Sequence, residues 1–233
     1  MKTQVQEDIF DNLNNEKVNY FLGLLATDGS IYENRIELAL AEKDLDIVEQ
    51  FKEFLDNKVT IREKYKTIKD KTFKSYRSAF RSNNIVNTLN GYGITKRKTL
   101  NLKLTIPFNY NLLRGIIDGD GCFLFNPEKY CSKLHIVSAS KDFINQIIKF
   151  YEQENYKYNL LVVIRGKSIY YNLNICGQKD LLRIINNLYL NANVFSKRKY
   201  ATAQQIRNNL VERLETQGTS VRNPEASLQL NEE

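Results

Sequence analysis

The chain has 233 residues, 42% of them hydrophobic, so it can bury a sizeable core in one large domain or in two fused domains of about 100 residues each. Its net charge of +7 favours a nucleic-acid partner, although a moderate basic excess is also common on other soluble proteins. Three cysteines without paired spacing give no sign of a disulfide framework or a zinc site, and a single histidine, His135, excludes metal sites that need two histidines.

The first predicted element is an apolar helix over residues 21–27, which ends in Asp28 and a glycine. The same pattern returns 92 positions later, over residues 113–119, and ends in Asp120 and a glycine. Either copy alone is most simply a core helix that stops at an Asp-Gly turn. Two aligned copies favour a duplicated acidic site instead.

The glycines inside these two helices predict close helix packing. Gly23 and Gly115 occupy equivalent positions, and each is followed four residues later by another small residue on the same helix face. If the helices pack side by side, Asp28 and Asp120 meet at their ends. Two carboxylates that close repel each other unless a cation lies between them, and their hard oxygen atoms suit Mg²⁺.

Hydrophobic periodicity predicts the rest of the first half. A hairpin is expected over 30–32 and 35–40, a helix over 43–55, and a second hairpin over 58–65 and 73–82.

The second half repeats this order. Strands are expected over 122–125 and 133–138, a helix begins near Lys141, and a hairpin follows over 159–165 and 168–176. The predicted fold class is therefore α+β, with tandem αββαββα repeats that form a pseudo-two-fold unit with two antiparallel sheets, each with one face left free by the helices.

Domain boundaries follow from this repeat. We expect a first half over 1–98, a linker over 99–109 in which Pro107 stops any helix, and a second half over 110–215 that ends in a helix. Residues 216–233 have no periodicity and are predicted to be disordered.

Strand alternation places many polar and basic side chains on the sheet faces that the helices leave free. Such side chains bind phosphates and read base edges in a major groove, although they are also typical of an ordinary solvated face. The predicted DNA contacts are Arg35, Lys58, Arg62, Lys64, Ser75, Arg77 and Arg81 in the first half, and Lys133, His135, Arg165, Tyr170, Asn172 and Asn174 in the second.

A basic triplet follows the last sheet-covering helix of each half, over residues 96–98 and 197–199. A single charge run is usually only solvated. The equivalent placement of the two runs favours a role at the paired acidic site.

The two acidic helices resemble the signature motifs of the LAGLIDADG homing endonucleases in their single-chain, two-motif form. The second copy keeps both motif acids, Asp118 and Asp120, whereas the first has Ala26 in place of the earlier acid. In the resembled family the later acid is the metal ligand, and both copies have it. Ala26 is therefore expected to remove a contact at the end of the first helix and to leave the metal ligand of that copy in place.

The resemblance also implies roles for individual residues. Metal ligands would be Asp28 and Asp120 with the backbone carbonyls of Thr27 and Gly119. Lysines near the scissile phosphate would be Lys98 and Lys199, which would stabilise charge on the phosphate. Polar residues that assist the site from just before a helix would be Glu42 and Ser140.

The function that this resemblance implies is site-specific, Mg²⁺-dependent cleavage of double-stranded DNA, with Mn²⁺ as a substitute and Ca²⁺ supporting binding only. The partner would be a long asymmetric DNA target cut with short 3′ overhangs by a monomer. Two alternatives remain: a maturase that binds intron RNA on the same scaffold, and a DNA-binding regulator that no longer cleaves. With no signal peptide pattern and no membrane span, the expected location is intracellular and soluble, in the cytoplasm or an organellar matrix.

Overall fold

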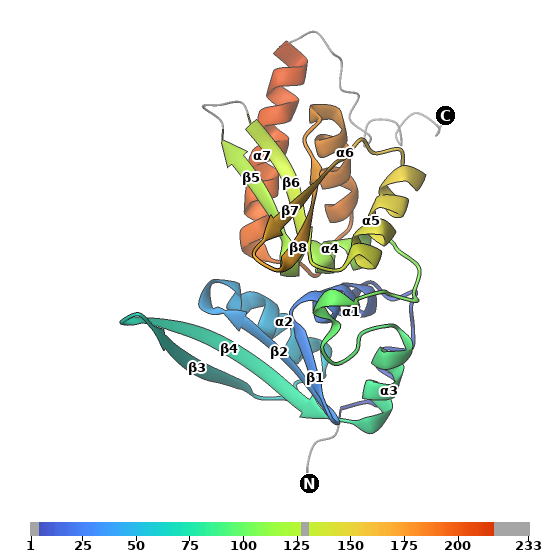
Figure 1. The fold of residues 1–233 in the computed structure, drawn as a ribbon, viewed down its shortest axis with the longest axis vertical. Helices are drawn as coiled ribbons and strands as arrows, with labels where there is room; N and C mark the ends of the chain where they lie inside the picture. The colour runs from blue at the N-terminus through green and yellow to red at the C-terminus, as the bar shows by residue number, and fades with distance from the viewer. Residues whose placement is uncertain (1–4, 127–130, 217–233) are drawn as a thin grey trace, which may run out of the picture.

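The computed structural model describes residues 5–126 and 131–216, which form two halves of the same design (Figure 1). The first half contains α1 (Glu16–Thr27), β1 (Gly29–Tyr32), β2 (Arg35–Ala41), the short helix η1 (Glu42–Asp44), α2 (Leu45–Phe54), β3 (Ile61–Ile68), β4 (Lys71–Arg81), α3 (Asn83–Gly91) and the short helix η2 (Lys98–Leu100). The second contains α4 (Tyr110–Asp120), β5 (Gly121–Asn126), β6 (Cys131–Ser138), α5 (Lys141–Gln153), β7 (Asn159–Arg165), β8 (Ser168–Ile175), α6 (Gln178–Tyr189) and α7 (Lys197–Thr216).

Each half has one four-stranded antiparallel sheet, with strand orders β1-β2-β4-β3 and β5-β6-β8-β7. Helices cover one face of each sheet, and α1 and α4 lie in the middle of the molecule, between the two sheets (Figure 1). The predicted α+β fold with tandem αββαββα repeats is therefore confirmed.

The two central helices begin at matching asparagine caps. The side chain of Asn15 accepts hydrogen bonds from the backbone N–H groups of Lys17 (2.8 Å) and Val18 (3.3 Å) at the start of α1. Asn109 accepts one from Leu112 (2.9 Å) at the start of α4. Because these caps satisfy otherwise unpaired donors, they fix where each helix enters the core.

The core is continuous through both halves. Residues of α1 from Tyr20 to Ala26 are buried, as are Leu112, Leu113, Ile116 and Ile117 of α4. The connection between the halves also packs on this core, since Leu102, Leu104 and Ile106 are buried and both backbone groups of Leu104 bond to Gln146. The linker is therefore held by the fold over part of its length.

Several predicted element boundaries differ from the structure by a few residues, and two of these differences involve Lys58 and Thr216. Strand β3 begins at Ile61, so Lys58 precedes it, because Asp56 and Asn57 adopt left-handed conformations that prolong the turn after α2. Helix α7 extends to Thr216, the first residue of the predicted tail. The rest of that tail lies outside the described residues. None of the helices in the described ranges could cross a membrane.

Candidate active site

The two motif helices cross with their glycines in contact. A Cβ atom on Gly23 would overlap the carbonyl oxygen of Leu112, and one on Gly115 would overlap that of Tyr20. Only a residue without a side chain allows the backbones to approach this closely. The interface expected for Gly23 and Gly115 is therefore present, and it brings the ends of α1 and α4 together.

Asp28 and Asp120 lie at this junction. The carboxylate of Asp28 rests against the other motif helix, since a Cβ atom on Gly119 would lie 3.1 Å from Asp28 Oδ2. Burial raises the pKa of Asp28 to about 6, and repulsion by Asp120 adds to this effect. Removal from water also raises the pKa of Asp120, although Asp120 as a whole residue is more exposed than Asp28. The two acids therefore form one electrostatically coupled site.

The two candidate lysines point at the same junction from opposite halves. Lys98 donates to the carbonyl oxygen of Gly29. Lys199 donates to the carbonyl oxygens of Ile117 (2.7 Å), Asp118 (2.6 Å) and Gly119 (3.2 Å). Both side chains are buried, and burial lowers the pKa of each ammonium group.

The electrostatic effects of the lysines reach both acids. Lys199 and Lys98 each oppose the upward pKa shifts of Asp28 and Asp120. One pair of lysines and one pair of acids, contributed by both halves, thus share a single compact site.

The oxygen donors at this junction fit a hard divalent cation. Within residues 5–126 and 131–216, no three His, Cys, Asp or Glu side chains form a metal-binding cluster, so a cation would depend on Asp28, Asp120 and backbone carbonyls. Mg²⁺ commonly uses one or two carboxylates and keeps several waters. Burial disfavours the charged forms of both acids, and Asp120 also repels Asp28; a bound cation would favour both charged forms.

Asp118 makes the helix-end contact expected of the earlier motif acid. Its Oδ2 atom accepts a 2.8 Å hydrogen bond from the Tyr20 hydroxyl and a 2.7 Å bond from the backbone N–H of Ser196, just before α7. Burial raises the pKa of Asp118 to about 6. Because Ser196 precedes Lys199 by one helical turn, this contact helps to set the position of the lysine. The equivalent residue in the first half, Ala26, cannot make it.

Asp44 also contributes to the site, although the sequence pattern did not predict this. Its Oδ1 atom pairs with Arg198 Nη2 at 2.7 Å, and its charge raises the pKa of Asp28. Asp46 also accepts a 2.8 Å bond from the backbone N–H of Lys197. These contacts hold the start of α7 against η1 and α2 of the other half. A local sequence window carries no signal for pairs so far apart in the chain.

Glu42 and Ser140 are engaged elsewhere. Glu42 is exposed, and its carboxylate lies 3.7 Å from Lys74 Nζ. Ser140 caps α5 by accepting from the Phe143 backbone N–H, and its hydroxyl donates to the Leu102 carbonyl at 2.7 Å. Their observed contacts are therefore structural.

The strand register gathers the predicted contacts of the first half on one face. Cross-strand partners are Arg35 with Arg81, Arg62 with Arg77, and Lys64 with Ser75. Directly opposite residues share a sheet face, and this face lies away from the core residues of the intervening positions. Lys58 is exposed but lies before the strand.

The second sheet brings most of its predicted contacts to one face as well. His135 and Asn174 are cross-strand partners, and alternation adds Lys133, Tyr170 and Asn172 to the same side. Arg165 shares that face near the end of the β7–β8 hairpin. Asn174, however, is only 4% exposed, and its Oδ1 atom lies 2.7 Å from His135 Nδ1. It therefore supports the histidine ring and is not presented to a ligand.

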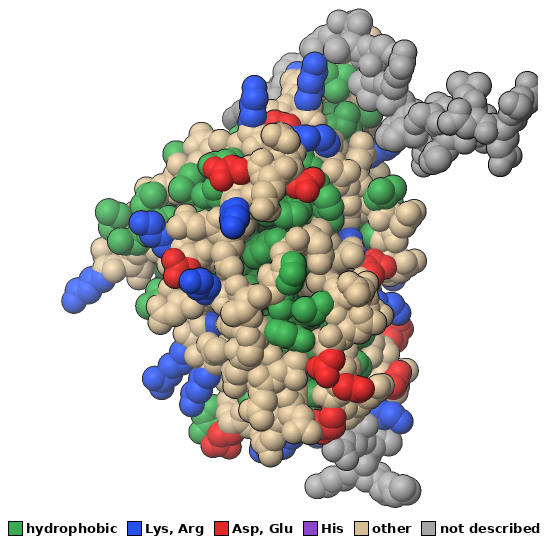
Figure 2. Space-filling view, turned by 90° about the vertical axis from the view of Figure 1, so that its right-hand side faces the viewer, with side chains coloured by type: hydrophobic (Ala, Val, Ile, Leu, Met, Phe, Trp, Pro, Cys, Tyr) green, Lys and Arg blue, Asp and Glu red, His purple; other side chains and the backbone are tan. Residues whose placement is uncertain are grey.

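The side of the molecule where α3 and α5 lie differs from the free sheet faces in its distribution of charged side chains. Figure 2 shows acidic and basic side chains interspersed over this surface. A polyanion would find no continuous basic track on it.

The fold and the paired motif helices define a two-motif protein of the LAGLIDADG class. A family model described as the LAGLIDADG-like domain matches residues 15–92 and 108–189. These segments cover more than half of the chain, and the chain belongs to this family. No match was found among curated proteins.

Solved structures of LAGLIDADG homing endonucleases share the fold. I-WcaI bound to its DNA recognition sequence matches with a TM-score of 0.58 and 14% identity, over 79% of this chain and 85% of that one. I-GzeII in complex with its DNA target gives 0.55 and 11%, over 90% and 95%. I-SmaMI bound to an uncleaved DNA target with calcium ions gives 0.54 and 10%, over 92% and 96%.

Proposed function

We propose that the chain is a homing endonuclease that cuts a specific site in double-stranded DNA with the help of Mg²⁺. The single observation that carries this proposal is the junction of α1 and α4, where Asp28 and Asp120 meet and Lys98 and Lys199 act on both. A plain core-helix pair has no need of two carboxylates whose repulsion costs stability.

Each residue of the junction has a distinct role in this proposal. Asp28 and Asp120, with the carbonyls of Thr27 and Gly119, would hold the metal. When bound, Mg²⁺ supplies a Lewis acid that activates water and stabilises the leaving oxygen. Lys98 and Lys199 place positive charge near the scissile phosphates, where negative charge grows during cleavage. One acid serves each strand.

The substrate follows from the two sheets. Their free faces carry arginine, lysine, asparagine and tyrosine, which suit phosphates and base edges of a major groove. The two halves differ in sequence, so a monomer would bind a long, asymmetric target. By analogy with the family, the cut is staggered and leaves short 3′ overhangs.

Two similar structures support the choice of partner and ion. I-WcaI was solved with its DNA recognition sequence, and I-SmaMI with an uncleaved DNA target and calcium ions. We infer that Ca²⁺ supports binding without cutting here too, and that Mn²⁺ replaces Mg²⁺.

The test uses purified protein and DNA that spans the uninterrupted form of the host locus. In Mg²⁺ one site should be cut, EDTA should stop the reaction, and Ca²⁺ should permit a stable complex with little product. Two results together would support the maturase function instead: no DNA from the locus is cut in Mg²⁺ or Mn²⁺, and the protein accelerates splicing of a co-transcribed intron.

A further inference from the structure

The two sheets present different chemistry on the faces that the helices leave free. The first sheet carries an arginine cluster, which consists of Arg35, Arg62 and Arg77 together with Glu37. The second sheet has no such cluster among its described residues and presents amide, phenol and aliphatic side chains beside the scattered Lys133, His135 and Arg165.

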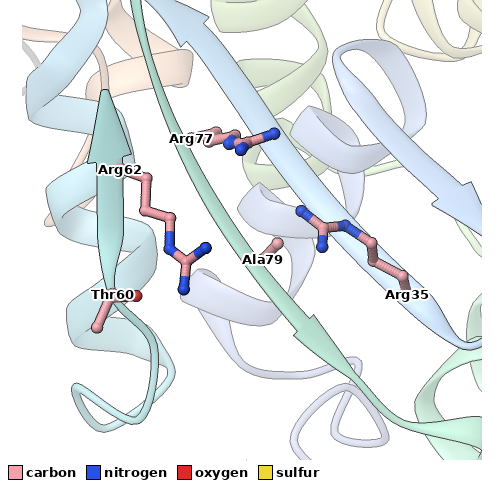
Figure 3. A pocket seen from close by; sticks show the side chains of 5 residues that line it. All are labelled: Arg35, Thr60, Arg62, Arg77 and Ala79. Atoms are coloured by element: carbon pink, nitrogen blue, oxygen red, sulfur yellow. The ribbon is translucent and has the colours of Figure 1, made fainter. Parts of the chain in front are cut away.

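The arginine cluster surrounds a hollow of about 100 Å³ above Ala79. Figure 3 shows Arg35 and Arg62 reaching toward this small residue from strands on either side, with Arg77 beside them. Arg62 and Arg77 are direct cross-strand partners. Because Ala79 fills little of the space, the edge of a base can approach the guanidinium groups.

Glu37 orients the cluster. Its Oε2 atom lies 2.5 Å from Arg35 Nη2 and 3.9 Å from Arg77 Nη1, and its side chain is only 19% exposed. One carboxylate beside Arg35 and Arg77, with Arg62 as a third cation around the hollow, leaves a net positive surface. The Nε atom of Arg77 is buried and has no hydrogen-bond partner in the described protein. The half-exposed Nη groups of Arg35 and Arg77, which Glu37 holds in place, and the exposed Arg62 beside them match the N7 and O6 acceptors of guanine.

The second sheet offers a contrasting pair at its β7–β8 hairpin. Asn172 and Leu161 are cross-strand partners, and Leu161 is 53% exposed on the face that faces away from the helices. An asparagine amide pairs with adenine at N6 and N7, and an aliphatic side chain contacts the thymine methyl group.

We propose that the arginine cluster reads two or more G·C pairs in one half of the DNA target, and that Asn172 and Leu161 read A·T pairs in the other half. This inference rests on the proposed function, because it assumes that both sheets lie in major grooves of one duplex. Under this proposal, the arginine cluster sets a preference for G·C pairs, and Asn172 and Leu161 set a preference for A·T pairs.

The experiment selects duplexes from a random library with the full chain in Ca²⁺, followed by sequencing of the bound pool. One half-site should be enriched in G·C pairs and the other in A·T pairs. With Arg62→Gln or Arg77→Gln, preference at one position of the G·C-rich half should change from guanine to adenine by about tenfold, because glutamine pairs with adenine. Asn172→Ala should relax only the A·T-rich half.

Lys149→Gln is the control with the same loss of charge, since this exposed residue lies on α5, away from the free sheet faces. It should leave every base preference unchanged. If the arginine variants weaken binding equally for all sequences, the cluster contacts only phosphates; this inference then fails while the proposed function stands. If no duplex is selected, and only folded intron RNA binds, both proposals fail.

Discussion

Lys199 Nζ donates a 3.2 Å hydrogen bond to the carbonyl oxygen of Gly119, one of the oxygens proposed to bind the metal. The same ammonium group also bonds to two neighbouring carbonyls, so it closes the end of α4. In the other half, Lys98 bonds to a single carbonyl among the described residues, that of Gly29. The two lysines therefore occupy equivalent positions in the sequence repeat but bond to different numbers of backbone carbonyls.

This difference predicts unequal effects of lysine removal. Lys199→Ala should lower the free energy of unfolding by about 1 to 2 kcal/mol more than Lys98→Ala, because more buried carbonyls lose their donor. Both variants should slow DNA cleavage more than they weaken DNA binding. Urea unfolding and single-turnover cleavage of the same preparations provide the measurements. Equal destabilisation by the two variants would contradict the assigned contacts.

The glycine crossing should tolerate no side chain. Gly23→Ala and Gly115→Ala should each lower the free energy of unfolding by about 3 kcal/mol, since the added methyl group meets backbone of the opposite helix. Gly91→Ala is the matched control, because a Cβ atom there meets nothing within 4 Å. It should be neutral or stabilising. Chemical denaturation measures all three, and a tolerated Gly23→Ala would show that the helices do not cross at this point.

The acidic pair should make the protein less stable as the pH rises. Asp28 has an ordinary pKa of 3.8 that the fold raises to about 6, so between these values the folded state binds more protons than the unfolded state. Stability therefore falls as the pH rises through this range and stays reduced above it.

Asp28→Asn removes that cost. At pH 7.5 and without metal, it should raise the free energy of unfolding by on the order of 2 kcal/mol, with little effect near pH 4. Added Mg²⁺ should stabilise the original protein more than the variant. Thermal unfolding across pH gives the comparison, and a destabilised variant at pH 7.5 would contradict the raised pKa of Asp28, which burial causes chiefly and Asp120 increases.

DNA binding should depend steeply on salt. We expect affinity to fall at least about a hundredfold between about 50 and 200 mM salt, because several phosphates are neutralised. Arg77→Ala and Arg81→Ala should weaken binding, whereas deletion of residues 217–233 should not. A fluorescence titration at several salt concentrations is sufficient, and a flat response would point to a protein partner.

The repeat made the centre of the site predictable. Asp28 and Asp120 stand at one offset in the sequence, and the helix crossing that joins them follows from glycine spacing. Strand alternation also identified the free sheet faces, because it depends only on backbone geometry.

Other parts of the site depend on contacts that no local pattern encodes. The bond from Tyr20 to Asp118 and the pair of Asp44 with Arg198 join residues far apart in the chain. Alternation gives the direction of a side chain but not its exposure. The burial of Asn174 could therefore not be predicted from the sequence. The same limit applies to Ser140, whose hydroxyl is used within the fold.

The most direct test of the account is strand cleavage of a target plasmid by the original protein, Asp28→Asn and Asp120→Asn in Mg²⁺. A carboxamide keeps the shape of each acid but loses the charge that holds the metal. The original protein should produce linear DNA, and neither variant should do so, while both bind the target within about tenfold of the original affinity. Linear product from either variant would contradict the central claim that both motif acids are required to cut the duplex.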